Sequence, residues 1–171
     1  LCVFVNDVVN LFVLSKSRGS KVPKAILGES FDGTIVSDFF SAYSPLEVEK
    51  GKCWAHLLRD SHQLAHRRPL PDPDSERVRF HDQLHQLYLA MGLALVEADA
   101  DPTRLAHIHR QMRDKLEAFA LLDWTDPDCV RLAKRILKHL DELVVWLENP
   151  DIAPDNNAAE RALRPAVVIR K

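Results

Sequence analysis

The chain of 171 residues has few of the features that mark secreted or membrane proteins. Its three cysteines are widely spaced and form no Cys-x-x-Cys pair, which argues against a disulfide framework and favours free thiols in a reducing compartment. No apolar run reaches the roughly 20 residues that span a bilayer, and the first residues do not have the form of a signal peptide. We therefore expect an intracellular protein without a membrane partner.

An excess of basic charge is also missing, because the formal net charge is −2. This excludes a uniformly basic surface for nucleic acid, so any contact with DNA would depend on local clusters of arginine. Apolar residues make up 46% and charged residues 28% of the chain, as in a soluble globular protein. The length fits one domain, or one domain with an inserted lobe.

Residues 1–67 predict part of a mixed α/β sheet. Residues 1–16 are typical of two adjacent strands joined by a turn, with apolar side chains on both faces, as in strands that are covered on each side. A helix that begins after Ser20 and a strand that ends on Asp38 are expected next. "GKCWAH" then predicts a strand that leads into a helix. Asp38 thus lies at the carboxyl end of a strand, where open α/β sheets bind ligands.

Residues 68–150 have a different character. The prolines of "RRPLPDPDSE" mark a linker. Beyond it, apolar residues recur at helical spacing in three segments, which are 84–95, 105–119 and 133–147. We predict an all-helical insertion here, after which residues 151–171 return to the α/β core.

The stretch "PDNNAAERALRP" places Asn157, Glu160 and Arg164 on one face of a helix. One interpretation is a surface helix capped by Asp155 or Asn156, with an ion pair between Glu160 and Arg164. The other is a carboxylate presented, with amide and guanidinium partners, beside a phosphate backbone. Spacing alone does not separate the two.

Asp38 also has two interpretations. It could simply begin the following turn through an Asx hydrogen bond. Alternatively, it converges with Glu160, and the two carboxylates supply hard oxygen ligands for Mg²⁺ or Mn²⁺. Two such ions, about 4 Å apart, activate a water or a 3′ hydroxyl and stabilise the leaving oxygen of a phosphodiester.

Histidines accompany one cysteine in "CWAHLLRDSHQLAH". A structural zinc site is one interpretation of this group, which consists of Cys53, His56, His62 and His66. The spacing fits no common zinc module, however, and a solvated helix face is the other interpretation. The same holds for His81 and His85.

Aromatic residues are expected mainly in the core. Base stacking is the alternative for the three tryptophans, which are Trp54, Trp124 and Trp146. Tyr43 follows Asp38 in "SDFFSAY" and is a candidate for a residue close to the site.

Three motifs, "GTIVSDFFSAY", "KCWAHLLRD" and "PDNNAAERALRPAVVIRK", resemble in this order the transposases of insertion sequence 66. The similarity extends over nearly the whole chain and is loosest in the helical segment. It implies a ribonuclease-H-like core with a DDE site for two Mg²⁺ or Mn²⁺ ions and a C-terminal catalytic helix. It also implies an enzyme of the bacterial cytoplasm that cuts element ends, joins them to target DNA and acts as a homo-oligomer.

On this resemblance, Asp38 is the second catalytic aspartate and Glu160 the catalytic glutamate, and both bind metal. Cys53 and His56 resemble the Cys-x-x-His element that follows this aspartate in several transposases. Contacts with DNA phosphates, or support for the metal ligands, are expected of the remaining motif positions, which are Asn156, Asn157, Arg161, Arg164, Arg170 and Lys171.

The resemblance also implies a first catalytic aspartate, in an upstream Asp-Glu-Thr segment, that has no counterpart here, because Asp7 lies in a turn. We therefore expect a central-to-C-terminal fragment that is inactive alone, without the DNA-recognition region of the family. The alternative is a catalytically dead remnant, or a domesticated helical interaction module that kept the motifs by descent.

Overall fold

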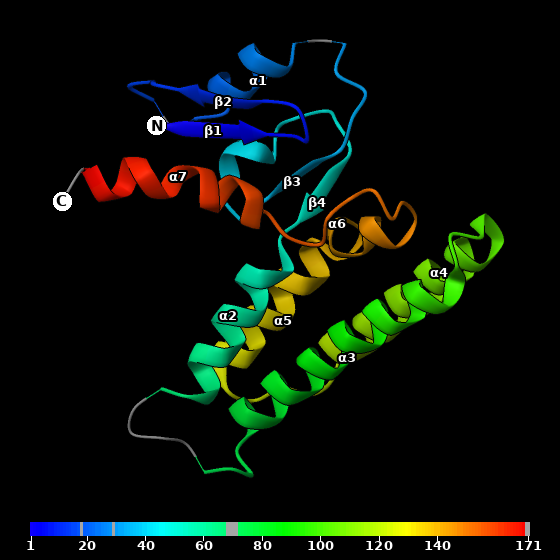
Figure 1. Ribbon diagram of the computed structural model, residues 1–171. Coiled ribbons are helices and arrows are strands. Elements are labelled where there is room, and N and C mark those ends of the chain that lie inside the picture. The colour runs from blue at the N-terminus through cyan, green and yellow to red at the C-terminus, as the bar shows by residue number, and fades with distance from the viewer. Residues whose placement is uncertain (18, 29, 68–71, 170–171) are drawn as a thin grey trace.

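The computed structural model describes residues 1–17, 19–28, 30–67 and 72–169. The fold is α/β, as predicted, and mostly helical (Figure 1). Its elements are β1 (Cys2–Val5), β2 (Asn10–Val13), α1 (Lys21–Leu27), β3 (Ile35–Ser37), the 3₁₀ turn η1 (Ser41–Tyr43), β4 (Lys50–Lys52), α2 (Trp54–Ala65), α3 (Glu76–Ala98), α4 (Pro102–Ala120), α5 (Pro127–Lys138), α6 (Leu140–Val144), the 3₁₀ turn η2 (Val145–Leu147) and α7 (Asn157–Ile169).

The first two strands form the predicted hairpin. β1 and β2 pair antiparallel, with Cys2 opposite Val13. The side chain of Asn6 holds the turn, because its Oδ1 accepts hydrogen bonds from the backbone N–H groups of Val8 (3.0 Å) and Val9 (2.7 Å). The prediction that both strands are covered is wrong for β2, where Phe12 is 49% exposed. α7 packs against β1, whereas the side chains of β2 are mostly exposed.

The strand that precedes Asp38 also lies where it was predicted. β3 pairs parallel with β4, with Ile35 opposite Lys50 and Ser37 opposite Lys52. Among the described residues, the strands form two separate pairs, so the prediction of one mixed sheet is wrong. Each of these two strands has only three residues, and they pair with each other rather than with the hairpin.

Two Asp-Pro pairs start α4 and α5, two helices of the lobe, a name we use for α3 to η2. Asp101 Oδ1 accepts a hydrogen bond from the N–H of Arg104 at 2.8 Å, and Pro102 occupies the first turn of α4. Asp126 caps α5 in the same way, with Pro127 in its first turn. An aspartate cap followed by proline is a strong helix start, because the cap satisfies a free N–H and proline presets the backbone.

The third predicted helix of the lobe is interrupted. α5 ends before His139, whose backbone has φ −121° and ψ 27°, and α6 and η2 follow in place of one helix through Leu147. The prediction of a continuous helix over 133–147 is therefore wrong. The break at His139 still allows Ile136 and Leu143, on its two sides, to be fully buried.

α2 shares a hydrophobic core with the lobe. Trp54 is buried, its Nε1–H donates to the carbonyl of Leu143 at 2.7 Å, and its ring lies 5.2 Å from that of Tyr88. The backbone N–H of Trp54 also donates to Pro154 O at 2.9 Å, where the chain leaves the lobe. Trp146 is buried and Trp124 packs on the core, so the prediction of core tryptophans is confirmed.

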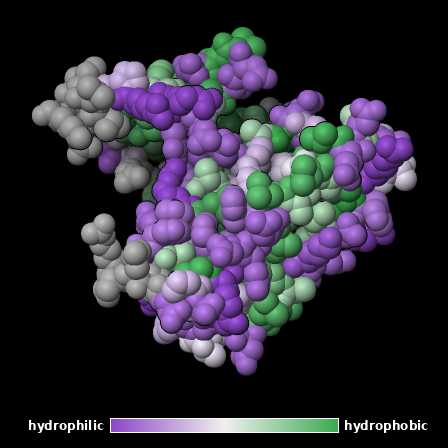
Figure 2. All heavy atoms as spheres, turned by 60° about the horizontal axis from the view of Figure 1, so that its bottom comes forward, coloured by the Kyte–Doolittle hydropathy of each residue, from purple (hydrophilic) through white to green (hydrophobic). Residues whose placement is uncertain are grey.

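The outer side of the lobe carries exposed apolar residues. On α3, Leu93 is 67% and Val96 80% exposed, and Figure 2 shows apolar surface between polar patches on this part of the molecule. Within the described ranges, all helices are too short or too polar to cross a bilayer.

Candidate active site

Cys53 joins the two parts of the chain that carry the candidate carboxylates. Its backbone N–H donates to Ser37 O at 2.9 Å, one residue before Asp38. Its Sγ accepts a hydrogen bond from the N–H of Asn156 at 3.4 Å, just before the helix that carries Glu160. We call this contact region the Cys53 junction, formed by Ser37, Cys53 and Asn156. It brings the end of β3 next to the start of α7.

The Cys53 thiol itself is a structural group. Its residue is fully buried, and burial, as the largest effect, raises the pKa of the thiol. Backbone hydrogen bonds, among them that of Asn156, lower the pKa and partly offset this rise. Since a thiolate is the reactive form, a buried thiol with a raised pKa is a poor nucleophile.

Asp38 lies directly after β3 and begins a turn. Its Oδ1 accepts a hydrogen bond from the N–H of Phe40 at 3.0 Å, and its carbonyl accepts one from Lys52 Nζ at 3.2 Å. The Asx hydrogen bond considered from the sequence is therefore confirmed. Because one carboxylate oxygen suffices for it, the bond is compatible with a ligand role for Asp38.

Glu160 lies in the first turn of α7, where a carboxylate is favoured by the helix dipole. Its Oε1 lies 3.2 Å from His56 Nε2, and its Oε2 lies 3.6 Å from Arg59 Nη2. Both partners are on α2, and the Glu160 side chain is 37% exposed. Among the described residues, Glu160 forms no ion pair with Arg164. Its carboxylate contacts α2 instead of its own helix.

The start of α7 confirms one part of the capping prediction. Asp155 Oδ1 accepts a hydrogen bond from the N–H of Asn157 at 2.9 Å, and the backbone carbonyl of Asn156 accepts the N–H of Glu160 at 3.1 Å. This geometry fixes the helix start beside Cys53 and orients Glu160 toward α2.

Two buried polar atoms near the junction have no hydrogen-bond partner among the described protein atoms. They are His56 Nδ1 and Asn156 Oδ1. Such atoms are rare in folded proteins, because an unpaired buried polar group is destabilising. One belongs to a partner of Glu160 and the other to the Cys53 junction.

The other predicted site residues fall into three groups. Arg161 and Arg164 are exposed on α7, and Asn157 is half-buried at its start. Tyr43 ends η1, the 3₁₀ turn that follows the Asp38 turn, and its backbone N–H donates to Phe40 O with an N···O distance of 3.4 Å. Arg170 and Lys171 lie outside the described residues.

The histidines and Cys53 do not form a zinc site. Cys53 and His66 flank opposite ends of α2, about 20 Å apart at 1.5 Å per residue. The rings of His62 and His66 stack at 3.9 Å, and His81 lies edge-on to His62 at 5.3 Å. In the part of the chain that the structure describes, no three His, Cys, Asp or Glu side chains are arranged to hold a metal ion.

Two residues near the site were missed from the sequence, Arg59 and Lys52. Arg59 lies three positions after His56 in "CWAHLLRD", so helical spacing could have placed both on one face of α2. Lys52 is buried beneath Asp38, and its side chain is 1% exposed. A lysine in a short polar strand gives no sequence signal for such burial.

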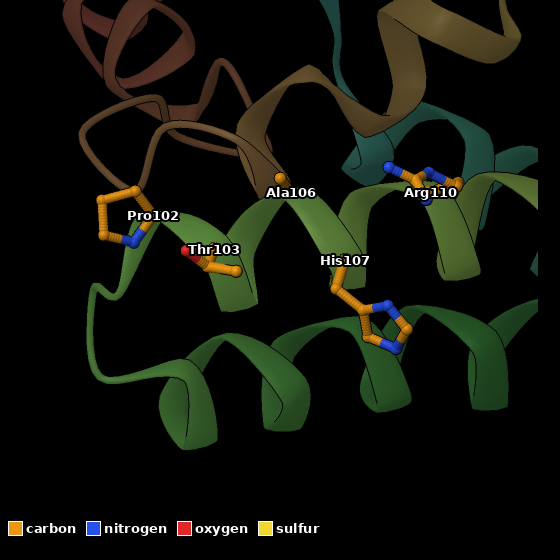
Figure 3. Close-up of a pocket in the computed structure, with 5 residues that line it drawn as sticks. All are labelled: Pro102, Thr103, Ala106, His107 and Arg110. Carbon is orange, nitrogen blue, oxygen red and sulfur yellow. The ribbon is translucent and has the colours of Figure 1, made fainter.

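Two surface hollows are lined by other residues. The larger, of about 530 Å³, lies on one face of α4 (Figure 3) and is lined by Pro102, Thr103, Ala106, His107 and Arg110. The smaller, of about 370 Å³, is lined by Ser75, Glu76, Arg77, Thr125 and Asp126. In the smaller hollow the charges already pair with each other, since Arg77 contacts Asp126 at 2.8 Å. Neither hollow includes Asp38 or Glu160.

Fold and site together define an α/β protein in which a helical lobe separates two acidic residues along the chain, while a buried cysteine joins the elements that carry them. The family model described as Transposase IS66 family matches residues 2–171. The chain belongs to this family of transposases, and its function is therefore related to transposition, which involves interaction with DNA. No curated protein and no solved structure matches the chain.

Proposed function

We propose that this chain carries the second and third acidic ligands, Asp38 and Glu160, of a DDE transposase with a ribonuclease-H-like core. The observation that carries the proposal is the Cys53 junction, where one residue hydrogen-bonds both Ser37 and Asn156. It brings together two segments that the lobe separates along the chain.

Asp38 and Glu160, on either side of the Cys53 junction, are hard oxygen donors of the kind that bind a divalent cation. Mg²⁺ is commonly held by one or two carboxylates, while waters and substrate phosphates complete its shell. Asp38 and Glu160 offer such carboxylates, and Asn156 in the Cys53 junction has an unpaired buried side-chain oxygen. When bound, a pair of such ions supplies an activated water or 3′ hydroxyl and stabilises the leaving oxygen of the phosphodiester.

The residues around Glu160 orient it and attract DNA. His56 and Arg59 hold the carboxylate from α2, at 3.2 Å and 3.6 Å. Arg59 is 49% exposed along its side chain, and Arg161 and Arg164 are exposed on α7. These guanidinium groups supply the local positive charge that a chain of net charge −2 needs in order to bind phosphates.

Mn²⁺ binding tests the role of the two carboxylates. We expect weak binding by the purified chain, measured by electron paramagnetic resonance, to be lost in Asp38→Asn and in Glu160→Gln. Asp114→Asn, which changes an exposed carboxylate on α4, is the matched control and should bind as the original chain does. Binding that persists in both site variants would refute the metal role and favour the non-catalytic remnant.

DNA nicking tests the enzyme. The resemblance implies a further ligand, the first catalytic aspartate, and we propose that residues 1–171 do not supply it, so we expect this chain alone to show no metal-dependent nicking of DNA. Robust cleavage that disappears in Glu160→Ala would contradict that expectation. Cleavage that persists in Glu160→Ala would instead point to a contaminating nuclease.

A further inference from the structure

Lys52 is a buried lysine whose amine reaches the Asp38 turn. Its Nζ donates to Asp38 O at 3.2 Å and to Ser37 Oγ at 3.3 Å, and its side chain is 1% exposed. A buried ammonium is strongly destabilising unless an anion and hydrogen-bond acceptors surround it. Here the anion comes from the lobe.

Glu142 on α6 supplies that anion. Its Oε2 lies 3.4 Å from Lys52 Nζ, and the same oxygen lies 2.9 Å from His139 Nδ1 at the break between α5 and α6. Lys52 thus links a carboxylate of the lobe to the backbone of the turn that holds Asp38. Among the described ion pairs, this is the contact that leads from the lobe to the Asp38 turn.

We propose that Lys52 is a positioning residue for Asp38, and that Glu142 acts on Asp38 through Lys52. The consequence for metal binding rests on the proposed function, whereas the effect on the conformation of the turn does not. Without Glu142, the Lys52 ammonium loses its counter-ion and no longer holds the backbone of the Asp38 turn in place.

Lys50 provides a matched control on the same strand. Its amine also approaches Glu142, at 4.0 Å, but it donates to the carbonyls of Ser44 and Leu46 and not to that of Asp38. Lys50→Met therefore removes a positive charge near Glu142 and leaves the Asp38 turn untouched. A general effect of charge or of strand stability would appear in both lysine variants.

The exchange rate of the Phe40 amide reports the turn directly, because this N–H donates to Asp38 Oδ1 at 3.0 Å. We expect Lys52→Met and Glu142→Gln to speed its hydrogen exchange about fivefold, the size expected for one lost hydrogen bond. Lys50→Met should leave the rate unchanged, and Lys52→Arg should restore part of the protection. Amides in the middle of α4 serve as a check that each variant is folded.

An unchanged Phe40 rate in Lys52→Met, or an equal acceleration in Lys50→Met, would overturn the proposal. If Lys52→Met does not fold, Glu142→Gln decides the question, because it keeps the size of the side chain and removes only its charge; an unchanged Phe40 rate in Glu142→Gln would then overturn the proposal. Mn²⁺ affinity should fall about fivefold in Lys52→Met and in Glu142→Gln, because the loss of about one hydrogen bond leaves Asp38 less well positioned. If the original chain binds no Mn²⁺, the proposed metal role fails, while the Phe40 exchange still decides the role of Lys52.

Discussion

The carbonyl of Leu143 accepts two indole hydrogen bonds, and this predicts a specific failure of additivity. Trp54 Nε1–H donates to it at 2.7 Å and Trp146 Nε1–H at 2.9 Å, and both tryptophans are buried. Replacing either by Phe removes one hydrogen bond, about 1 kcal/mol net, and leaves a smaller ring, about 1–2 kcal/mol of lost packing. Each single variant should therefore lose about 2–3 kcal/mol of unfolding free energy.

The double variant should lose more than the sum of the two singles. In each single variant the Leu143 carbonyl keeps one side-chain donor, but in Trp54→Phe/Trp146→Phe it loses both. Leaving a buried acceptor without these donors adds about 1–2 kcal/mol. If the two substitutions instead shared one cavity, the second would be less destabilising than the first, and the coupling energy would have the opposite sign.

Urea unfolding at constant pH measures this cycle. Trp124→Phe serves as the control partner for Trp54→Phe, because Trp124 donates to a different carbonyl, that of Phe119, at 3.0 Å. This control pair should be additive within about 0.5 kcal/mol. Additive or less than additive losses for Trp54→Phe with Trp146→Phe would refute the shared-acceptor reasoning.

Two further predictions concern α3. Burial, as the largest effect, followed by the charge of His62, lowers the pKa of His81 from its ordinary value of 6.5. The folded state therefore favours neutral His81. This stabilisation is fully present above the ordinary pKa and is lost as the pH falls through the lower pKa of the folded state. In urea titrations, His81→Gln should weaken the loss of stability below about pH 6.5, and an unchanged pH dependence would contradict this. A Cβ added at Gly92 meets no atom within 4 Å, so Gly92→Ala should raise the unfolding free energy by about 0.5–1 kcal/mol, and a lowered urea midpoint would contradict it.

Local signals in the sequence predicted local structure well. The Asp-Pro pairs at 101–102 and 126–127 start helices where expected, because the cap and the proline act within one turn. The Asx hydrogen bond of Asp38 is of the same kind, since donor and acceptor lie two residues apart. Motifs that depend on such short range can be found without knowledge of the fold.

Long-range arrangements could not be predicted in this way. The contact of Glu160 with His56 and Arg59 joins positions about one hundred residues apart, and the alternative i, i+4 pair was equally consistent with the spacing. The apolar residues of β2 predicted a buried strand, but they did not indicate which segment would cover it. The break at His139 was hidden because apolar residues continue at helical spacing on both sides of it.

The hydrogen bond between the Trp54 backbone N–H and Pro154 O places the start of α2 beside the segment that follows the lobe. The chain therefore returns to the same place however far α3 and α4 extend. The turn between α3 and α4 could lengthen or shorten without changing the spacing of the two flanking acidic residues. α2 and α6 do not share this freedom, because α2 contacts Glu160 and α6 contacts Lys52.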